Sequence, residues 1–177
     1  CLDPACGSYW VCGDDPRYTT GIVLQVANAD STITNNEITN DFGVSVSVDG
    51  NDDGDPSGSI TLGNNTITGG IAYGYEVRNF ATVELSDSAI SGVEWNHLGS
   101  SSNINNGFGI VVAGCADVSI SDISSNDNEV VGLGLFSVTS ADLDNIVLER
   151  NNWWGAYIAD SVFDATNLDL TDNNIFG

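Results

Sequence analysis

The side chains best suited to bind a ligand lie in the acidic segment 49–58, which reads DGNDDGDPSG. Its oxygen-bearing residues alternate around a glycine, in the order Asp49, Asn51, Asp53, Gly54 and Asp55. This spacing matches the first half of a calcium-binding loop, where short oxygen side chains converge on the ion and glycine permits a sharp turn. The twelfth position is Ile60 instead of a bidentate Glu. Either another segment completes a calcium site, or the segment forms a solvated turn.

A second candidate site consists of Asp87 and Asp122, which follow Gly74 and Gly109 by the same number of residues. If the two segments are neighbours in a stacked structure, these carboxylates lie within about 5 Å of each other. At that distance the repulsion raises the pKa of one carboxyl group, unless the pair binds a cation or the two side chains point outward into solvent. Paired carboxylates are also the catalytic groups of glycoside hydrolysis. The alternative is a pair of turn residues that face solvent.

Aromatic residues late in the sequence offer a surface for sugars, because their rings combine an apolar face with a polar edge. Trp153 and Trp154 are the candidate carbohydrate contacts, and Tyr157 and Phe176 follow them. The Trp pair directly precedes a glycine of the repeat discussed below, and the equivalent pair one repeat earlier is 130–131, both Val. We therefore expect one Trp of the pair to be buried in the core.

Cysteines cluster at the start of the sequence, where Cys1, Cys6 and Cys12 are candidates for disulfides. The clustering predicts a Cys-rich N-terminal cap over residues 1–19 in an oxidising compartment, with the pairing left open. A zinc site would need closer Cys pairs or nearby His ligands. Cys1 also resembles the lipid-bearing first residue of a mature bacterial lipoprotein. We expect an extracellular or cell-surface protein, either secreted or held by a lipid anchor at Cys1.

The charge of the chain excludes several classes of partner. Its formal net charge is -22, and its three basic residues are Arg17, Arg78 and Arg150. Nucleic acid and anionic lipid should therefore be repelled, whereas cations such as calcium should be attracted. No apolar stretch reaches the roughly 18 residues of a transmembrane helix. The hydrophobic fraction of 41% is that of a folded domain, and the acidity also keeps its surface solvated.

An internal repeat organises the elements that must position these residues. Gly109, Gly132 and Gly155 are 23 residues apart, and Gly21 and Gly43 are 22 apart. After each glycine, apolar and polar residues alternate, turn at small residues, alternate again and reach an Asn-rich turn. Alternation with a period of two indicates strands with one buried face. One such unit cannot bury that face alone, so the units must stack as coils.

The stacked coils predict an all-β parallel β-helix over residues 20–177, with about seven coils and a period of 22–23 residues. Two predicted core columns are Val83, Val118 and Ala141, and Leu85, Ile120 and Leu143. Asn pairs at 35–36, 64–65, 151–152 and 173–174 are expected at turns, where Asn tolerates left-handed backbone and can form ladders. Side loops are expected near 49–58 and 91–106.

The pattern G-I-x-V … A-x-x-x-I-x-x-N-x-I-x-x-N resembles the repeat of the pectate-lyase-like right-handed parallel β-helix proteins. The resemblance covers about residues 20–177 and implies their fold, which enzymes and structural proteins share. Lyases of this type need a basic residue as Brønsted base, but the chain has no Lys, and Arg78 and Arg150 occupy different positions of the repeat. Hydrolases of this type combine several Asp with a His, whereas His97 stands alone in a predicted loop.

These observations favour a non-enzymatic extracellular structural solenoid, a surface or filament-forming protein. The last repeat shows no polar cap, so we expect self-association through end-to-end stacking of the terminal coils. The alternative is a carbohydrate-active enzyme, either a polysaccharide lyase or a glycoside hydrolase, or a carbohydrate-binding module acting on polysaccharide. Calcium is the one expected cofactor.

Overall fold

The computed structural model describes residues 20–25, 30–39, 43–50, 56–95 and 107–174. Apolar and polar residues alternate there in short runs between Asn, Asp, Ser and Gly, which favour turns, so the chain forms short strands. The strands are β1 (Thr20–Gln25), β2 (Asp30–Thr34), β3 (Glu37–Thr39), β4 (Val44–Asp49), β5 (Ser59–Gly63), β6 (Thr66–Thr68), β7 (Tyr73–Arg78), β8 (Thr82–Ser86), β9 (Ala89–Ser91), β10 (Phe108–Ala113), β11 (Asp117–Asn126), β12 (Val131–Phe136), β13 (Ser140–Val147), β14 (Trp154–Ala159) and β15 (Phe163–Asp169). Within these ranges no helix is long and apolar enough to cross a membrane.

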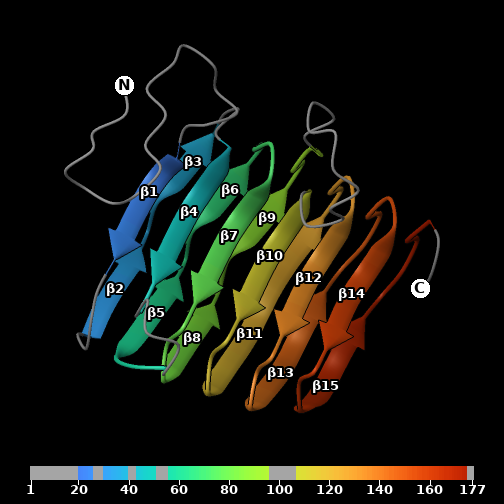
Figure 1. Cartoon of the computed structure of the whole chain (residues 1–177). Helices are drawn as coiled ribbons and strands as arrows, with labels where there is room; N and C mark the ends of the chain where they lie inside the picture. Colours follow the sequence, from blue (N-terminus) through green and yellow to red (C-terminus); the bar gives the residue numbers. More distant parts are fainter. Residues whose placement is uncertain (1–19, 26–29, 40–42, 51–55, 96–106, 175–177) are drawn as a thin grey trace, which may run out of the picture.

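The strands stack in parallel into coils (Figure 1). One sheet, which we call sheet A, has the order β1-β4-β7-β10-β12-β14, so it counts six coils within the described residues. The other strands form sheet B, in which β8 and β9 both pair with the long strand β11. This parallel stack confirms the expected all-β fold class.

The strand register confirms both predicted core columns. Val83, Val118 and Ala141 are aligned, as are Leu85, Ile120 and Leu143. All six side chains are buried in one hydrophobic core that extends along the stack. Because neighbouring strands are about 4.8 Å apart, each apolar side chain covers the one in the next coil.

The first coil is longer than the repeat predicts. Thr20 pairs with Val44, 24 residues later, so Gly21 lies opposite Ser45 and its predicted match with Gly43 is wrong. Ser45 can occupy the position that glycine holds in later coils because its side chain is small, and it is fully buried.

Later coils differ in length near the two predicted side loops. The spacing in sheet A is 29 residues from β4 to β7, 35 from β7 to β10, and 23 in the following coils. The two longer intervals contain residues 51–55 and 96–106, which lie outside the described part. β4 ends at Asp49 and β9 at Ser91, and the strands on either side of both intervals remain paired with their neighbours.

Each coil turns where one residue adopts a left-handed backbone conformation. At the corner that divides the coil within sheet B, the stacked left-handed residues are Asn35, Asn64, Asp87, Asp122, Asn145 and Asn167. Asn and Asp tolerate positive φ angles better than other L-residues because their short side chains bond locally. The left-handed Asn prediction is confirmed at this corner. At the corner before sheet A, the left-handed residue next to Asn151 is Arg150.

The Asn residue that follows the corner points inward and forms hydrogen-bonded ladders. The backbone and side-chain amides of Asn36 both donate to Oδ1 of Asn65 at 2.9 Å. In the same way, those of Asn128 donate to Oδ1 of Asn151 at 3.1 and 2.9 Å. The first ladder lies at the corner within sheet B and ends at Ser88, whereas the second lies at the corner before sheet A. These bonds satisfy polar groups that would otherwise be costly to bury.

Candidate functional site

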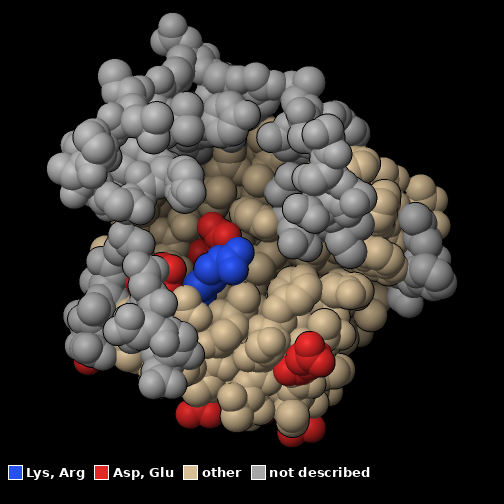
Figure 2. Space-filling view, viewed as in Figure 1, with Lys and Arg blue, Asp and Glu red and all other residues tan. Residues whose placement is uncertain are grey.

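The outer face of sheet A changes character along the stack. In β7, Tyr75 and Val77 belong to the core, whereas Glu76 and Arg78 lie on the outer face. The position of Glu76 becomes Val111 in β10, and then glycine and tyrosine in β12 and β14. Figure 2 shows one patch of basic side chains (blue) with acidic side chains (red) beside it on this side of the described surface. Most of the remaining described surface in this view is uncharged (tan). Charged groups at one place therefore border an apolar stretch.

Seven aromatic rings form a continuous chain of contacts on this face, which we call the aromatic track. In order, the rings are those of Tyr73, Phe108, Phe136, Tyr157, Trp154, Trp153 and Trp95, with successive centroids 6.2, 6.1, 5.6, 5.3, 5.5 and 5.9 Å apart. Tilted and edge-on pairs at such distances each contribute about 0.5–1.5 kcal/mol beyond their buried area. The track crosses β7, β10, β12 and β14, so it links four successive coils.

The middle of the track is a second hydrophobic core outside the coils. Phe108 is 2% exposed and Val131 0% exposed, although both lie on the outer side of sheet A. The rings at the rim are only partly buried: Tyr73, Phe136, Tyr157, Trp153 and Trp154. Neither Trp153 nor Trp154 enters the core of the coils, so the expectation that one of them would is wrong. The residue before each repeat glycine faces outward, as Val131 also does.

Gly134 leaves room for two rings of the track because it has no side chain. A Cβ atom at this position would lie 2.8 Å from the ring of Phe136 and 2.9 Å from that of Phe108. Both rings therefore lie directly over the backbone of β12. No side chain larger than hydrogen fits beneath them without a shift, because contacts below 3.0 Å exceed normal packing.

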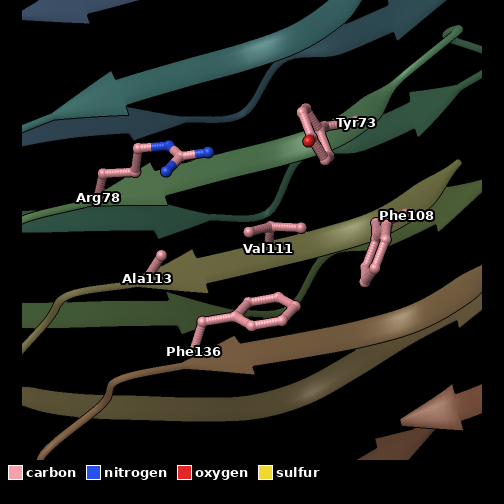
Figure 3. A pocket seen from close by; sticks show the side chains of 6 residues that line it. All are labelled: Tyr73, Arg78, Phe108, Val111, Ala113 and Phe136. Atoms are coloured by element: carbon pink, nitrogen blue, oxygen red, sulfur yellow. The ribbon is translucent and has the colours of Figure 1, made fainter. Parts of the chain in front are cut away.

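A pocket of about 150 Å³ opens beside the track, lined by Tyr73, Arg78, Phe108, Val111, Ala113 and Phe136. Figure 3 shows Val111 near its centre, with Tyr73 and Phe108 toward one end and Arg78 and Ala113 toward the other. Tyr73, Phe108 and Phe136 belong to both the pocket and the track. The guanidinium group of Arg78 is the only charged group among these six lining residues.

Arg78 is neutralised by its neighbour in β7. Its Nε and Nη2 donate to Oε1 of Glu76 at 2.9 and 2.7 Å, and Ser47 Oγ donates to Oε2 of Glu76 at 3.1 Å. Burial acts to lower the pKa of Arg78, but the charge of Glu76 acts against it and the pKa is raised. Burial and the Glu76 charge also raise the pKa of Tyr73 to about 12. At neutral pH the pocket thus offers a compensated guanidinium and a protonated phenol.

The predicted calcium loop begins at Asp49, the last residue of β4. The Oδ1 atom of Asp49 accepts a hydrogen bond from Nδ2 of Asn79 at 3.0 Å. The other predicted ligands, Asn51, Asp53 and Asp55, lie outside the described residues. The calcium loop therefore stays a prediction.

Asp87 and Asp122 occupy neighbouring positions of the left-handed corner, since Ser86 and Ser121 directly before them are paired. Both are exposed, and Asn145 donates to Oδ1 of Asp122 at 2.6 Å. Within the part of the chain that the structure describes, no group of three or more His, Cys, Asp or Glu side chains could hold a metal ion. Cation binding by this pair stays a prediction.

The remaining candidate residues do not join the site. Arg150 bonds to Asp127 at 2.8 and 2.9 Å at a different corner, so it is separate from the Arg78 pair. Cys115 is a free, buried thiol, and burial raises its pKa to about 11. Cys1, Cys6, Cys12, His97 and Phe176 lie outside the described residues.

The sequence prediction named three members of the aromatic track, Trp153, Trp154 and Tyr157, and missed the other four. A signal is nevertheless present, because Tyr73, Phe108 and Trp154 each directly precede a glycine of the repeat. Aligned on those glycines, the three residues form one column of sheet A. An aromatic residue at that position therefore indicates a ring on the outer face.

Comparison with protein-family models matches residues 19–177 to the right-handed beta helix region. Comparisons with curated proteins and with solved structures gave no match. The matched range includes all strands from β1 to β15. From its repeat, its parallel stack and this match, the chain belongs to the right-handed β-helix family.

Proposed function

We propose that this protein is a non-catalytic extracellular β-helix that binds a polysaccharide along the outer face of sheet A. The observation that carries the proposal is the aromatic track, whose seven rings are in continuous contact across four coils. The faces of sugar rings that carry C–H groups pack on aromatic rings, and Tyr and Trp add a polar edge for hydroxyl groups. A polymer lying across the coils would contact several rings at once.

The rigidity of the rim supports binding to an extended ligand. Tyr157 and Trp154 are both partly exposed, with an interplanar angle of 32°. Phe136 continues this surface on the neighbouring strand, about 4.8 Å away. Because these rings pack against the second core, little side-chain entropy is lost when a ligand binds.

The chemistry of the Arg78 pair supports binding over catalysis. A general acid or base must gain or lose a proton near the working pH. Arg78 instead has a raised pKa and is held by the carboxylate of Glu76. An extracellular location is supported by the net charge of -22, which keeps an exposed surface solvated. Self-association through the terminal coils stays a separate prediction.

Affinity electrophoresis through gels containing single soluble polysaccharides would test this proposal, followed by calorimetry on the ligands that retard the protein. Trp154→Ala and Tyr157→Ala should each weaken binding by about tenfold, equivalent to about 1.4 kcal/mol. Phe163→Ala is the matched control, because Phe163 is an aromatic residue, 42% exposed, on β15 of sheet B. Thermal melts of all variants would show that they remain folded.

Two results would reject the sheet A surface. One is the absence of retardation by every polysaccharide in the panel, which would leave a structural solenoid as the function. The other is an equal loss of binding in Phe163→Ala and Trp154→Ala, which would place the ligand elsewhere.

A further inference from the structure

We infer that the pocket beside the aromatic track binds the acetyl group of a neutral, acetylated polysaccharide. This inference rests on the proposed function, because it names the class of polymer that the same face would bind. The size of the pocket, its apolar lining and its compensated charge each restrict the ligand.

The size and lining of the pocket select a small, mostly apolar group. Its volume of about 150 Å³ corresponds to roughly five water molecules at about 30 Å³ each, which is room for a substituent of a few heavy atoms. Val111 and Ala113 lie on β10, and the rings of Phe108 and Phe136 complete an apolar lining. A methyl group fits these surroundings, whereas a hydroxyl group would lose hydrogen bonds to water.

The polar side of the pocket selects a neutral hydrogen-bond acceptor. Two nitrogens of Arg78 donate to Glu76, and the Arg78 side chain is still 43% exposed, so guanidinium N–H groups remain for a ligand. Because Glu76 already balances the charge of Arg78, a carboxylate ligand would meet no net positive charge and would approach a chain of net charge -22. A carbonyl oxygen can accept from Arg78 without that repulsion.

An acetyl group combines the two properties, since it joins a methyl group to a carbonyl oxygen. The pocket shares Tyr73, Phe108 and Phe136 with the track. A sugar ring packed at this end of the track would therefore direct its acetyl substituent into the pocket. Tyr73 lies at the same end, and its phenol is protonated at neutral pH and can donate a hydrogen bond.

The test compares neutral oligosaccharides with and without acetyl groups. Hexa-N-acetylchitohexaose and cellohexaose have the same β-1,4-linked backbone, length and charge, but the first carries an acetamido group where the second carries the C2 hydroxyl group. Acetylated xylo-oligosaccharides and their deacetylated forms make the same comparison for O-acetyl groups. Calorimetry should show at least about tenfold tighter binding of the acetylated member in one of the two pairs. Equal affinities within both pairs would overturn the acetyl assignment and leave the polysaccharide proposal standing, whereas no binding of any of the four would count against both.

Two variants test the pocket itself. Ala113→Leu fills it and should abolish the preference for the acetylated member, while Ala89→Leu makes the same change at an exposed position of sheet B and should keep it. Glu76→Gln removes the charge that balances Arg78, so this variant should gain measurable binding of hexagalacturonate at low salt. An unchanged acetyl preference in Ala113→Leu, or binding of hexagalacturonate by the wild type as strong as that by Glu76→Gln, would overturn the inference.

Discussion

Replacing Gly134 by Ala tests whether the aromatic track is held in place by the backbone beneath it. The new Cβ would lie 2.8 and 2.9 Å from two aromatic rings, so at least one ring must move. Overpacking of this kind costs about 1–3 kcal/mol, and replacing a strand glycine by alanine returns about 0.5–1 kcal/mol. We expect a net loss of up to about 2.5 kcal/mol in the free energy of unfolding, measured by urea denaturation.

Gly63→Ala is the matched control, because Gly63 also lies in a strand. Its Cβ would meet Ser86 Oγ at 3.3 Å, a tight contact that a small shift of this side chain would relieve, and Thr34 Cγ2 at 3.5 Å, an ordinary contact. This variant should be neutral or up to about 1 kcal/mol more stable than the wild type. If Gly134→Ala is as stable as Gly63→Ala, the rings are not constrained by the backbone of β12. The argument that the track is preorganised would then fail.

Three further predictions concern other parts of the stack. Asn151→Ala should lower the free energy of unfolding by about 3 kcal/mol in urea titrations, because it leaves the buried amides of Asn128 without their acceptor. Asn152→Ala, at an exposed position, should change the free energy of unfolding little. Asp122→Asn should raise the melting temperature at low salt by relieving repulsion from Asp87, and a gain that persists unchanged near 1 M salt would contradict this explanation. Burial raises the pKa of Cys115 from 9.0 to about 11, so between these pH values the thiol ionises in the unfolded chain but not in the folded one. The stability that Cys115 contributes should therefore be complete below pH 9 and decline as the pH rises from 9 to 11. This decline should be absent in Cys115→Ala.

The stacking of coils could be predicted from the sequence because it depends on a local signal. Alternation marks the strands, and the 23-residue spacing of the later glycines aligned Val118 with Ala141 correctly. The first coil could not be aligned in this way, because Ser45 replaces the glycine of the repeat and Gly43 is a closer match in sequence. A small side chain satisfies the same steric requirement, but it does not show in a search for glycine.

The candidate site was harder to predict because it depends on which residues point outward from sheet A. Tyr73 and Phe108 directly precede Gly74 and Gly109, so the alignment of these glycines places them in neighbouring coils although 35 residues separate them. The alignment did not show that both rings lie on the outer face. The expectation that one residue of the Trp153–Trp154 pair would be buried in the core was also wrong. Strict alternation places one of two consecutive residues on each face, whereas both of these lie on the outer face. The pocket requires side chains from three coils and could not be anticipated from any single repeat.

The two Asn ladders meet in the coil that contains β9, and this has a consequence for folding. The first ladder runs from Asn36 through Asn65 to Ser88, and the second begins where the backbone N–H of Val93 donates to Oδ1 of Asn128 at 3.2 Å. In a stacked protein, cooperativity passes through contacts between nearest neighbours, and here the ladders bridge the coils on both sides of β9. The longer connection of 35 residues adds only about 0.4 kcal/mol of closure entropy relative to 23. We therefore expect the stack to open as one cooperative unit, with no step in the free energies of hydrogen exchange between β9 and β11.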